Sequence, residues 1–240
     1  MFKRPFHQRI ARVLTSLDGD LLKSRHCLFG GGTVIALRFG EYRESVDIDF
    51  LVSDLNGYRN VRQRMTADGI SAIMLPGKTD LLQARGIRAD QYGIRTMLSV
   101  DDQLIKFEIV LEGRINLAAP SAQDSLCGIA TLTTLDMATS KLLANSDRWA
   151  DDGVFSRDLI DLAMMQPGLP LLRKALAKAE GAYGDTIRSD LEKAIQHIQT
   201  RHGWLERCMQ AMAMTSPKAL VWQRIRTLHK ALSAVKAPAD

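Results

Sequence analysis

The sequence has few cysteines, few aromatic residues and no long apolar run. Its 240 residues include three widely spaced cysteines, Cys27, Cys127 and Cys208, and none shows the C-x-x-C spacing of a zinc or redox site. No window approaches the roughly 18 uninterrupted apolar residues of a membrane-spanning helix, and the first residues lack the apolar core of an export signal. We therefore expect a cytoplasmic protein that does not associate with a membrane.

The excess of positively over negatively charged residues is also small. Lys and Arg total 32 against 27 Asp and Glu, so the net charge of +5 favours anionic partners only mildly. Hydrophobic residues make up 46% of the chain and charged residues 25%, which is typical of a globular protein with a substantial core. This composition excludes a disordered or fibrous chain, and the partner class has to come from motifs.

The pattern of the sequence divides the chain into two unlike parts. Up to about residue 120, short β-rich runs alternate with helical segments, whereas from about residue 132 the apolar spacing is helical only. We predict an α+β protein: a domain over residues 1–125 with a mixed twisted sheet and flanking helices, followed by an all-α helical bundle over residues 126–240.

The first chemical signal is a glycine turn, Gly30 to Gly32, which follows the apolar run HCLF and precedes a helix that begins at Thr33. Glycine permits the positive φ angles and close backbone approach with which successive N–H groups bind a phosphate. A plain strand-to-helix turn is the alternative, because glycine clusters are common in turns. No Gly-Lys-Ser/Thr follows and Ile35 replaces the third glycine of a dinucleotide motif, so the turn is neither a P-loop nor a Rossmann motif.

The second signal is a pair of acids, Asp47 and Asp49, inside the apolar run VDIDFLV. Side chains two apart on a strand share one face, so both carboxylates converge on one small volume. Such a pair is costly without a compensating cation, and Mg²⁺ is the ion that carboxylates and substrate phosphates hold together. We predict a magnesium site; the alternative is a pair of strand-end aspartates in water or bonded to Arg38 or Arg43.

A third acid is expected at such a metal site, and Glu108 is the candidate. In QLIKFEIVLEG the alternation places Glu108 on the same face as Lys106. We predict Glu108 as a metal ligand, and a salt bridge between Glu108 and Lys106 is the alternative.

The order of these features resembles the DNA polymerase β-like nucleotidyltransferase superfamily and, more narrowly, the AbiEii/AbiGii toxin family. The family's Arg-x-Ser-x-Asp-x-Asp-Phe run is matched by Arg43, Ser45, Asp47, Asp49 and Phe50. Its later helical lysine and Arg-Asp-x-x-Asp-Leu run are matched by Lys141, Arg157, Asp158, Asp161 and Leu162. The resemblance spans about residues 28–165, and Gly32 stands where relatives often have serine.

The resemblance implies a nucleotidyltransferase fold for residues 1–125 and transfer of a nucleoside monophosphate from a nucleoside triphosphate to an acceptor hydroxyl. It implies Mg²⁺, or Mn²⁺ in its place, held by Asp47, Asp49 and Glu108, with Lys141 and Asp158 as further catalytic residues. The nucleotide-binding residues would be Gly31, Gly32, Thr33, Arg43, Ser45 and Lys141. A structural salt bridge between helices is the alternative for Lys141 and Asp158. We expect Asp161 and Arg148 at the surface or behind the site.

The resemblance also implies partners. The chain would be a toxin of a toxin–antitoxin or phage-defence system, with an antitoxin protein as partner and tRNA or another RNA as acceptor. Basic residues of the later helices, including Arg173 and Lys174, either follow an RNA backbone or form ordinary solvated faces. The competing functions are a non-catalytic nucleotide-binding regulator and an antibiotic-modifying nucleotidyltransferase.

Overall fold

The computed structural model describes residues 2–78 and 82–236, and its contacts divide the chain into two compact units. Unit 1 comprises Met1–Glu41 and Ser45–Thr133, and unit 2 comprises Tyr42–Glu44 and Thr134–Asp240. The division after Thr133 differs from the sequence-based boundary after residue 125. The reason is a backbone link, since Leu132 N–H donates to the Phe29 carbonyl in the first strand of unit 1 (2.9 Å).

Unit 1 is built on a mixed sheet. Its strands are β1 (Cys27–Phe29), β2 (Asp47–Val52), β3 (Leu82–Gln83), β4 (Arg88–Ala89), β5 (Gly93–Val100) and β6 (Gln103–Leu111). The order is β1-β2-β6-β5-β3, with β4 also on β5, and β2 runs parallel to β6 while the other pairs are antiparallel. The predicted mixed α+β architecture is confirmed. A small hairpin, β7 (Ser125–Leu126) with β8 (Ile129–Ala130), completes the described strands of this unit.

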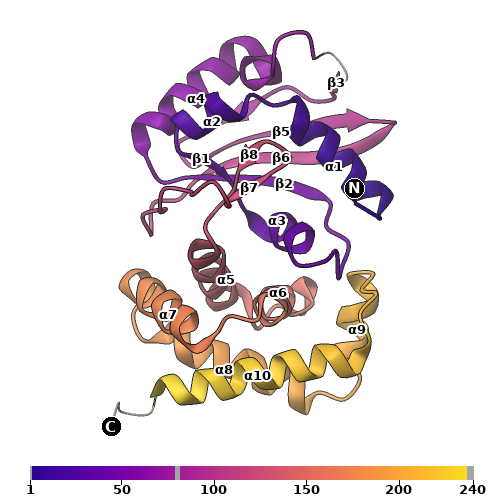
Figure 1. The fold of residues 1–240 in the computed structure, drawn as a ribbon, viewed down its shortest axis with the longest axis vertical. Coiled ribbons are helices and arrows are strands. Elements are labelled where there is room, and N and C mark those ends of the chain that lie inside the picture. The colour runs from indigo at the N-terminus through magenta and orange to yellow at the C-terminus, as the bar shows by residue number, and fades with distance from the viewer. Residues whose placement is uncertain (1, 79–81, 237–240) are drawn as a thin grey trace. The chain divides into compact units, whose positions relative to one another are not determined.

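Helices flank this sheet. They are α1 (Pro5–Ser16), α2 (Gly19–Ser24), α3 (Gly31–Arg38), α4 (Leu55–Asp68) and the short 3₁₀ turn η1 (Gly69–Ile73). Local chemistry sets their starts: Pro5 begins α1, and the Asp54 carboxylate accepts the Gly57 N–H to cap α4 (2.6 Å). Helices α3 and α4 both contact β2 and are drawn on opposite sides of the sheet in Figure 1.

Alternation along β2 separates a core face from a polar face. Ile48, Phe50 and Val52 are fully buried, and the Phe50 ring lies 5.6 Å from the rings of both Phe29 and Phe107. The intervening residues, Asp47 and Asp49, therefore share the opposite face, where they are half-buried. Both the strand and the separation of its core face from its polar face agree with the sequence pattern.

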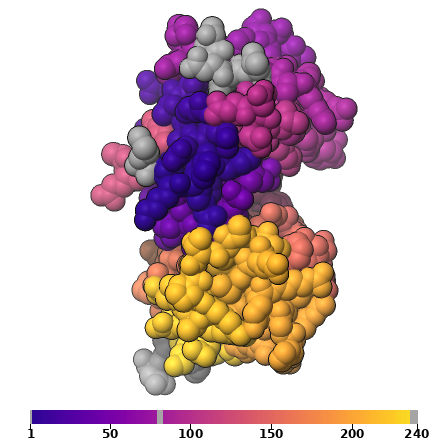
Figure 2. All heavy atoms as spheres, turned by 90° about the vertical axis from the view of Figure 1, so that its right-hand side faces the viewer, coloured from indigo at the N-terminus to yellow at the C-terminus, as the bar shows by residue number. Residues whose placement is uncertain are grey.

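The regular elements of unit 2 are all helices over its described residues. They are α5 (Thr134–Arg148), η2 (Asp152–Val154), α6 (Arg157–Met165), α7 (Leu169–Tyr183), α8 (Thr186–Thr200), α9 (Trp204–Ala211) and α10 (Lys218–Lys236). Helix α5 packs against α6, α7 and α8, and α10 packs against α6 and α7. In the space-filling view, residues of the later helices, orange to yellow, form most of the visible face of this unit (Figure 2). Within the described parts of the chain, no helix has both the length and the apolar character needed to cross a membrane.

Candidate active site

The glycine turn lies directly against the second aspartate of β2. The Gly30 N–H donates to the Asp49 carbonyl (2.8 Å), and Gly31 has a φ of +69°. A Cβ added to Gly31 would lie 2.5 Å from Asp49 Oδ2. Only glycine therefore fits between the start of α3 and this carboxylate. The structure brings together the two features that the sequence singled out first.

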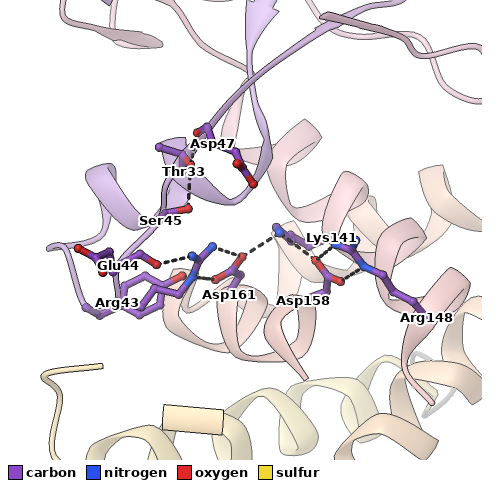
Figure 3. A network of polar contacts seen from close by, with 10 residues as sticks. Thr33, Arg43, Glu44, Ser45, Asp47, Lys141, Arg148, Asp158 and Asp161 are labelled. Atoms are coloured by element: carbon purple, nitrogen blue, oxygen red, sulfur yellow. Dashed lines mark hydrogen bonds and ion pairs between the residues drawn. The ribbon is translucent and has the colours of Figure 1, made fainter. Parts of the chain in front are cut away.

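Thr33 and Ser45 hold the backbone at Asp47. The buried Thr33 hydroxyl donates to the Asp47 carbonyl (2.5 Å) and lies 2.8 Å from Ser45 Oγ, which donates to it. Figure 3 shows these bonds at the start of β2. Both hydroxyls were predicted to bind nucleotide, but in the structure they bond to each other and to the strand. These bonds fix the backbone position from which the Asp47 side chain extends, and nucleotide binding by the two hydroxyls stays a prediction.

His7 extends this chain of hydrogen bonds to α1, and sequence reasoning missed it. The fully buried ring accepts the Ser45 N–H at Nε2 (3.1 Å), so Nδ1 carries the proton and donates to Glu41 Oε1 (2.8 Å). Burial alone would raise the pKa of Glu41, but hydrogen bonds from the Lys3 backbone and from His7 lower it below its ordinary value. One histidine in an amphipathic helix gives no sequence signal for this role, since its partners lie more than 30 residues away.

Glu108 lies beside the aspartates, but its oxygens are occupied. In the parallel register Asp49 is opposite Glu108 and Asp47 is opposite Lys106, so all four side chains share one face of the sheet. Glu108 accepts a hydrogen bond from Arg95 Nε at one oxygen and from Lys106 Nζ at the other, each at 2.5 Å. Burial raises the pKa of Glu108, but the two cations more than offset this and lower it.

The predicted group of three carboxylates is consequently not assembled. No cluster of three or more His, Cys, Asp or Glu side chains suited to a metal occurs among residues 2–78 and 82–236. The alternative, a salt bridge between Glu108 and Lys106, is the observed arrangement, with Arg95 added from β5. A ligand role for Glu108 would have to compete with these two cations and stays a prediction.

A second cluster of ionic groups lies within unit 2, where two helices meet. Lys141 Nζ, on α5, is 2.9 Å from Asp158 Oδ1 and 2.8 Å from Asp161 Oδ2, both on α6. Arg148 Nε donates to the other Asp158 oxygen (2.7 Å). Lys141, Asp158 and Asp161 are all at least 94% buried at the side chain. The predicted Lys141–Asp158 pair thus exists as an ion pair between helices (Figure 3).

Asp161 is the centre of this cluster and is fully buried, so of the two expected positions, at the surface or behind the site, the surface is excluded. The Tyr42 hydroxyl donates to its Oδ1 (2.5 Å), and Arg43 donates to both of its oxygens (2.7 and 2.9 Å). Tyr42 and Arg43 belong to the short segment that the chain contributes to unit 2 between α3 and β2. The planar guanidinium of Arg43 has N–H donors whose spacing matches the two oxygens of a carboxylate, so it suits this bidentate contact. Arg43, predicted to bind nucleotide, is buried against this carboxylate, and its contact with nucleotide stays a prediction.

Electrostatics stabilise the charged forms of this cluster. Burial raises the pKa of Asp158, but Lys141 and Arg148 pull it well below its ordinary value. For Asp161, Arg43 and Lys141 likewise outweigh burial and lower the pKa. Asp158 and Asp161 therefore stay ionised at neutral pH, and the network ties α5, α6 and the Tyr42–Glu44 segment together.

A family model described as Nucleotidyl transferase AbiEii toxin, Type IV TA system, matches residues 12–230. The chain belongs to this family. It is a toxin nucleotidyltransferase by membership, and the resemblance read from the motifs is confirmed.

Two solved structures share the fold of this AbiEii-family chain. A candidate nucleotidyltransferase from H. pylori is 17% identical, with 98% of this chain and 96% of that chain covered and a TM-score of 0.53. MenT4, a nucleotidyltransferase toxin from Mycobacterium tuberculosis, is 16% identical over 95% of this chain and 92% of its own, with a TM-score of 0.50. No curated protein sequence matches the chain.

Proposed function

We propose that this AbiEii-family chain transfers a nucleoside monophosphate from a nucleoside triphosphate to an acceptor hydroxyl, with Asp47 and Asp49 beside the reacting phosphate. The observation that carries the proposal is the pair of carboxylates on one face of β2 with the glycine turn pressed against Asp49. This places two anionic side chains beside backbone amides suited to phosphate.

Asp47 and Asp49 fit a bound Mg²⁺. Magnesium is commonly held by one or two protein carboxylates and completed by substrate phosphate oxygens, so a third acid is not obligatory. The missing side chain of Gly31 lets the backbone at the start of α3 lie directly against Asp49, where phosphate bound by its N–H groups would be close to that carboxylate. When bound, the metal would polarise a phosphate oxygen, and Mn²⁺ accepts the same hard oxygen ligands.

The glycine turn would bind phosphate through the N-terminus of α3. Gly30, the N-cap, provides no side-chain hydrogen bond to the first turn of α3. The N–H groups of Gly31, Gly32 and Thr33 at such a helix start attract an anion. Lys106, on the face of the two aspartates, adds a positive charge. Burial lowers the pKa of Lys106, but Glu108, Asp49 and Asp47 raise it overall, so its ammonium stays protonated near the developing phosphate charge.

Other residues would keep Asp47 in position. Thr33, which is held by Ser45, bonds to its carbonyl and thereby fixes the backbone from which the carboxylate extends. Arg43, Lys141 and Asp158 enter the proposal as positioning residues that anchor the Tyr42–Glu44 segment preceding β2. Direct contact of Arg43 or Lys141 with the triphosphate stays a prediction. A variant of either residue with a raised KM for nucleotide and unchanged stability would support it.

The family description supports the biological part of the proposal, a toxin in a type IV toxin–antitoxin system. We propose an antitoxin protein as partner, tRNA or another RNA as acceptor, the cytoplasm as location, and unit 2 as a separate helical domain.

The proposal is tested by incubating purified protein with Mg²⁺, total RNA and each α-labelled nucleoside triphosphate in turn. Label is expected in RNA with at least one nucleotide, and Asp47→Asn should give none. Nucleotide binding without label transfer to any acceptor would identify a non-catalytic regulator, whereas transfer only to an added aminoglycoside would identify an antibiotic-modifying enzyme; either result overturns the RNA proposal.

A further inference from the structure

A second surface of unit 1 lies at the other end of its central strands. A cavity of about 790 Å³ is lined by residues of α4, of the β4–β5 turn and of the segment that follows β6. It lies where β2 and β6 end, because Val52 pairs with Leu111 there, whereas Asp47, the first residue of β2, pairs with Lys106 five residues earlier. This surface is thus distinct from the candidate active site.

Two arginines of α4 give this surface positive charge. Arg59 is exposed and has no ion-pair partner among the described residues. Arg62 donates from Nη1 to the Asp90 carbonyl (3.1 Å), and its guanidinium lies 5.9 Å from the centre of the Tyr58 ring. Both arginines also line an adjoining hollow of about 500 Å³ with Gln63. Because the two hollows share both arginines, they form one extended basic surface. This surface is longer than the binding site of a single phosphate group would be.

The carboxylates near these arginines already have partners. Both oxygens of Glu112 accept hydrogen bonds from the Arg114 guanidinium (2.9 and 2.7 Å). Asp90 Oδ1 accepts the N–H groups of Tyr92 and Gly93, which lower the pKa of Asp90, while its Oδ2 pairs with Arg95. Neither acid neutralises Arg59.

An exposed aromatic ring accompanies the charge. Tyr92 lines the cavity and is 65% exposed, which is unusual for a large aromatic side chain. Its turn is ordered: Asp90 binds its N–H (2.7 Å), and its carbonyl accepts the Leu111 N–H (2.9 Å). The Tyr58 hydroxyl donates to the Asp90 carbonyl, which ties the same turn to α4 (2.7 Å). The backbone that carries this ring is therefore held in place, and the ring is exposed to solvent at the same cavity as the two arginines.

We propose that this surface, defined by Arg59, Arg62 and Tyr92, binds a single-stranded RNA. Guanidinium groups pair with successive backbone phosphates, and an exposed tyrosine stacks on a base that is free of a duplex. An acidic protein would use the arginines but gives no reason for the displayed ring. That the strand is RNA rather than DNA rests on the proposed function.

The test is fluorescence anisotropy of the full chain with a labelled single-stranded RNA of mixed sequence, titrated at several salt concentrations. Arg59→Gln with Arg62→Gln should weaken binding about tenfold or more and reduce the slope of log K against log salt by about 1.4, since each lost phosphate contact removes about 0.7. Tyr92→Ser should weaken binding about fivefold or more with little change in the slope.

The matched control removes equal charge elsewhere: Arg173→Gln with Lys174→Gln, on the exposed side of α7, should leave affinity nearly unchanged. Asp47→Asn should bind RNA like the wild type, which separates this inference from the proposed catalysis. Tighter binding of the same sequence as a duplex, or equal affinity of the wild type and the Arg59/Arg62 variant, would overturn the proposal. So would an affinity loss in the α7 control as large as in the α4 variant.

Discussion

At Gly31, the addition of a single methyl group is expected to change the position of the Asp49 carboxylate. Because a Cβ would lie 2.5 Å from Asp49 Oδ2 and the backbone has a φ of +69°, we expect Gly31→Ala to displace the carboxylate. A displacement of about 1 Å at a reacting centre costs on the order of 100-fold in rate, so transfer should fall by that amount. Initial rates and thermal unfolding of the variant measure both effects.

The control for this substitution is Gly181→Ala in α7, where the added Cβ meets nothing within 4 Å. It should leave the rate unchanged and stabilise the protein by about 0.4–1 kcal/mol. A Gly31→Ala protein with the wild-type rate would show that the tight contact with Asp49 has no part in catalysis.

Asp161 is expected to make a large contribution to the stability of unit 2 because it compensates two buried cations. Removing its charge leaves Arg43 and Lys141 buried with one compensating carboxylate fewer. We expect Asp161→Asn to lower the free energy of unfolding by about 3–5 kcal/mol, measured by urea denaturation. Asp185→Asn, at an exposed helix start without a side-chain cap bond, should change it by less than about 0.5 kcal/mol. Similar stability of the two variants would contradict the role given to the network.

At the scale of elements, the contact of α5 with α6 should depend on pH. The pKa values of Asp158 and Asp161 are lower in the folded protein than their ordinary values, so the folded state favours their ionised forms. Their contribution to stability is present above the unfolded pKa of about 3.9 and is lost as pH falls through the lower folded values. The free energy of unfolding should therefore fall below about pH 4, and Asp158→Asn should flatten that fall. An equally steep fall in the variant would assign the effect to other groups.

Helix α1 is coupled to β2 through His7. We expect His7→Ala to leave the Ser45 N–H without its acceptor, to loosen the start of β2 and to lower kcat with little change in KM for nucleotide. The loss of stability should be about 1–3 kcal/mol, as for other buried hydrogen-bonding groups left unpaired. Kinetics of this variant beside Gln8→Ala, an exposed neighbour on α1, measure the effect. An unchanged kcat would show that the Asp47 position does not depend on α1.

At the scale of the whole molecule, local patterns could be predicted and distant pairings could not. The alternation in VDIDFLV and the glycines before Thr33 each determine a local conformation, so β2 and the turn into α3 were predictable from the sequence. Arg95 reaches Glu108 because β5 pairs with β6, a register that no short motif encodes. The place of Arg43 depends on Asp161, 118 residues away, which is why its burial in unit 2 was not foreseen.

The most direct test of the central claim is the rate of label transfer by Asp47→Asn and Asp49→Asn relative to the wild type, at saturating Mg²⁺ and nucleotide. Replacing one carboxylate by an amide preserves size and removes charge, so both variants should lose at least about a thousandfold in rate while unfolding like the wild type. Transfer at the wild-type rate by either folded variant would contradict the claim that these two carboxylates hold the reacting centre.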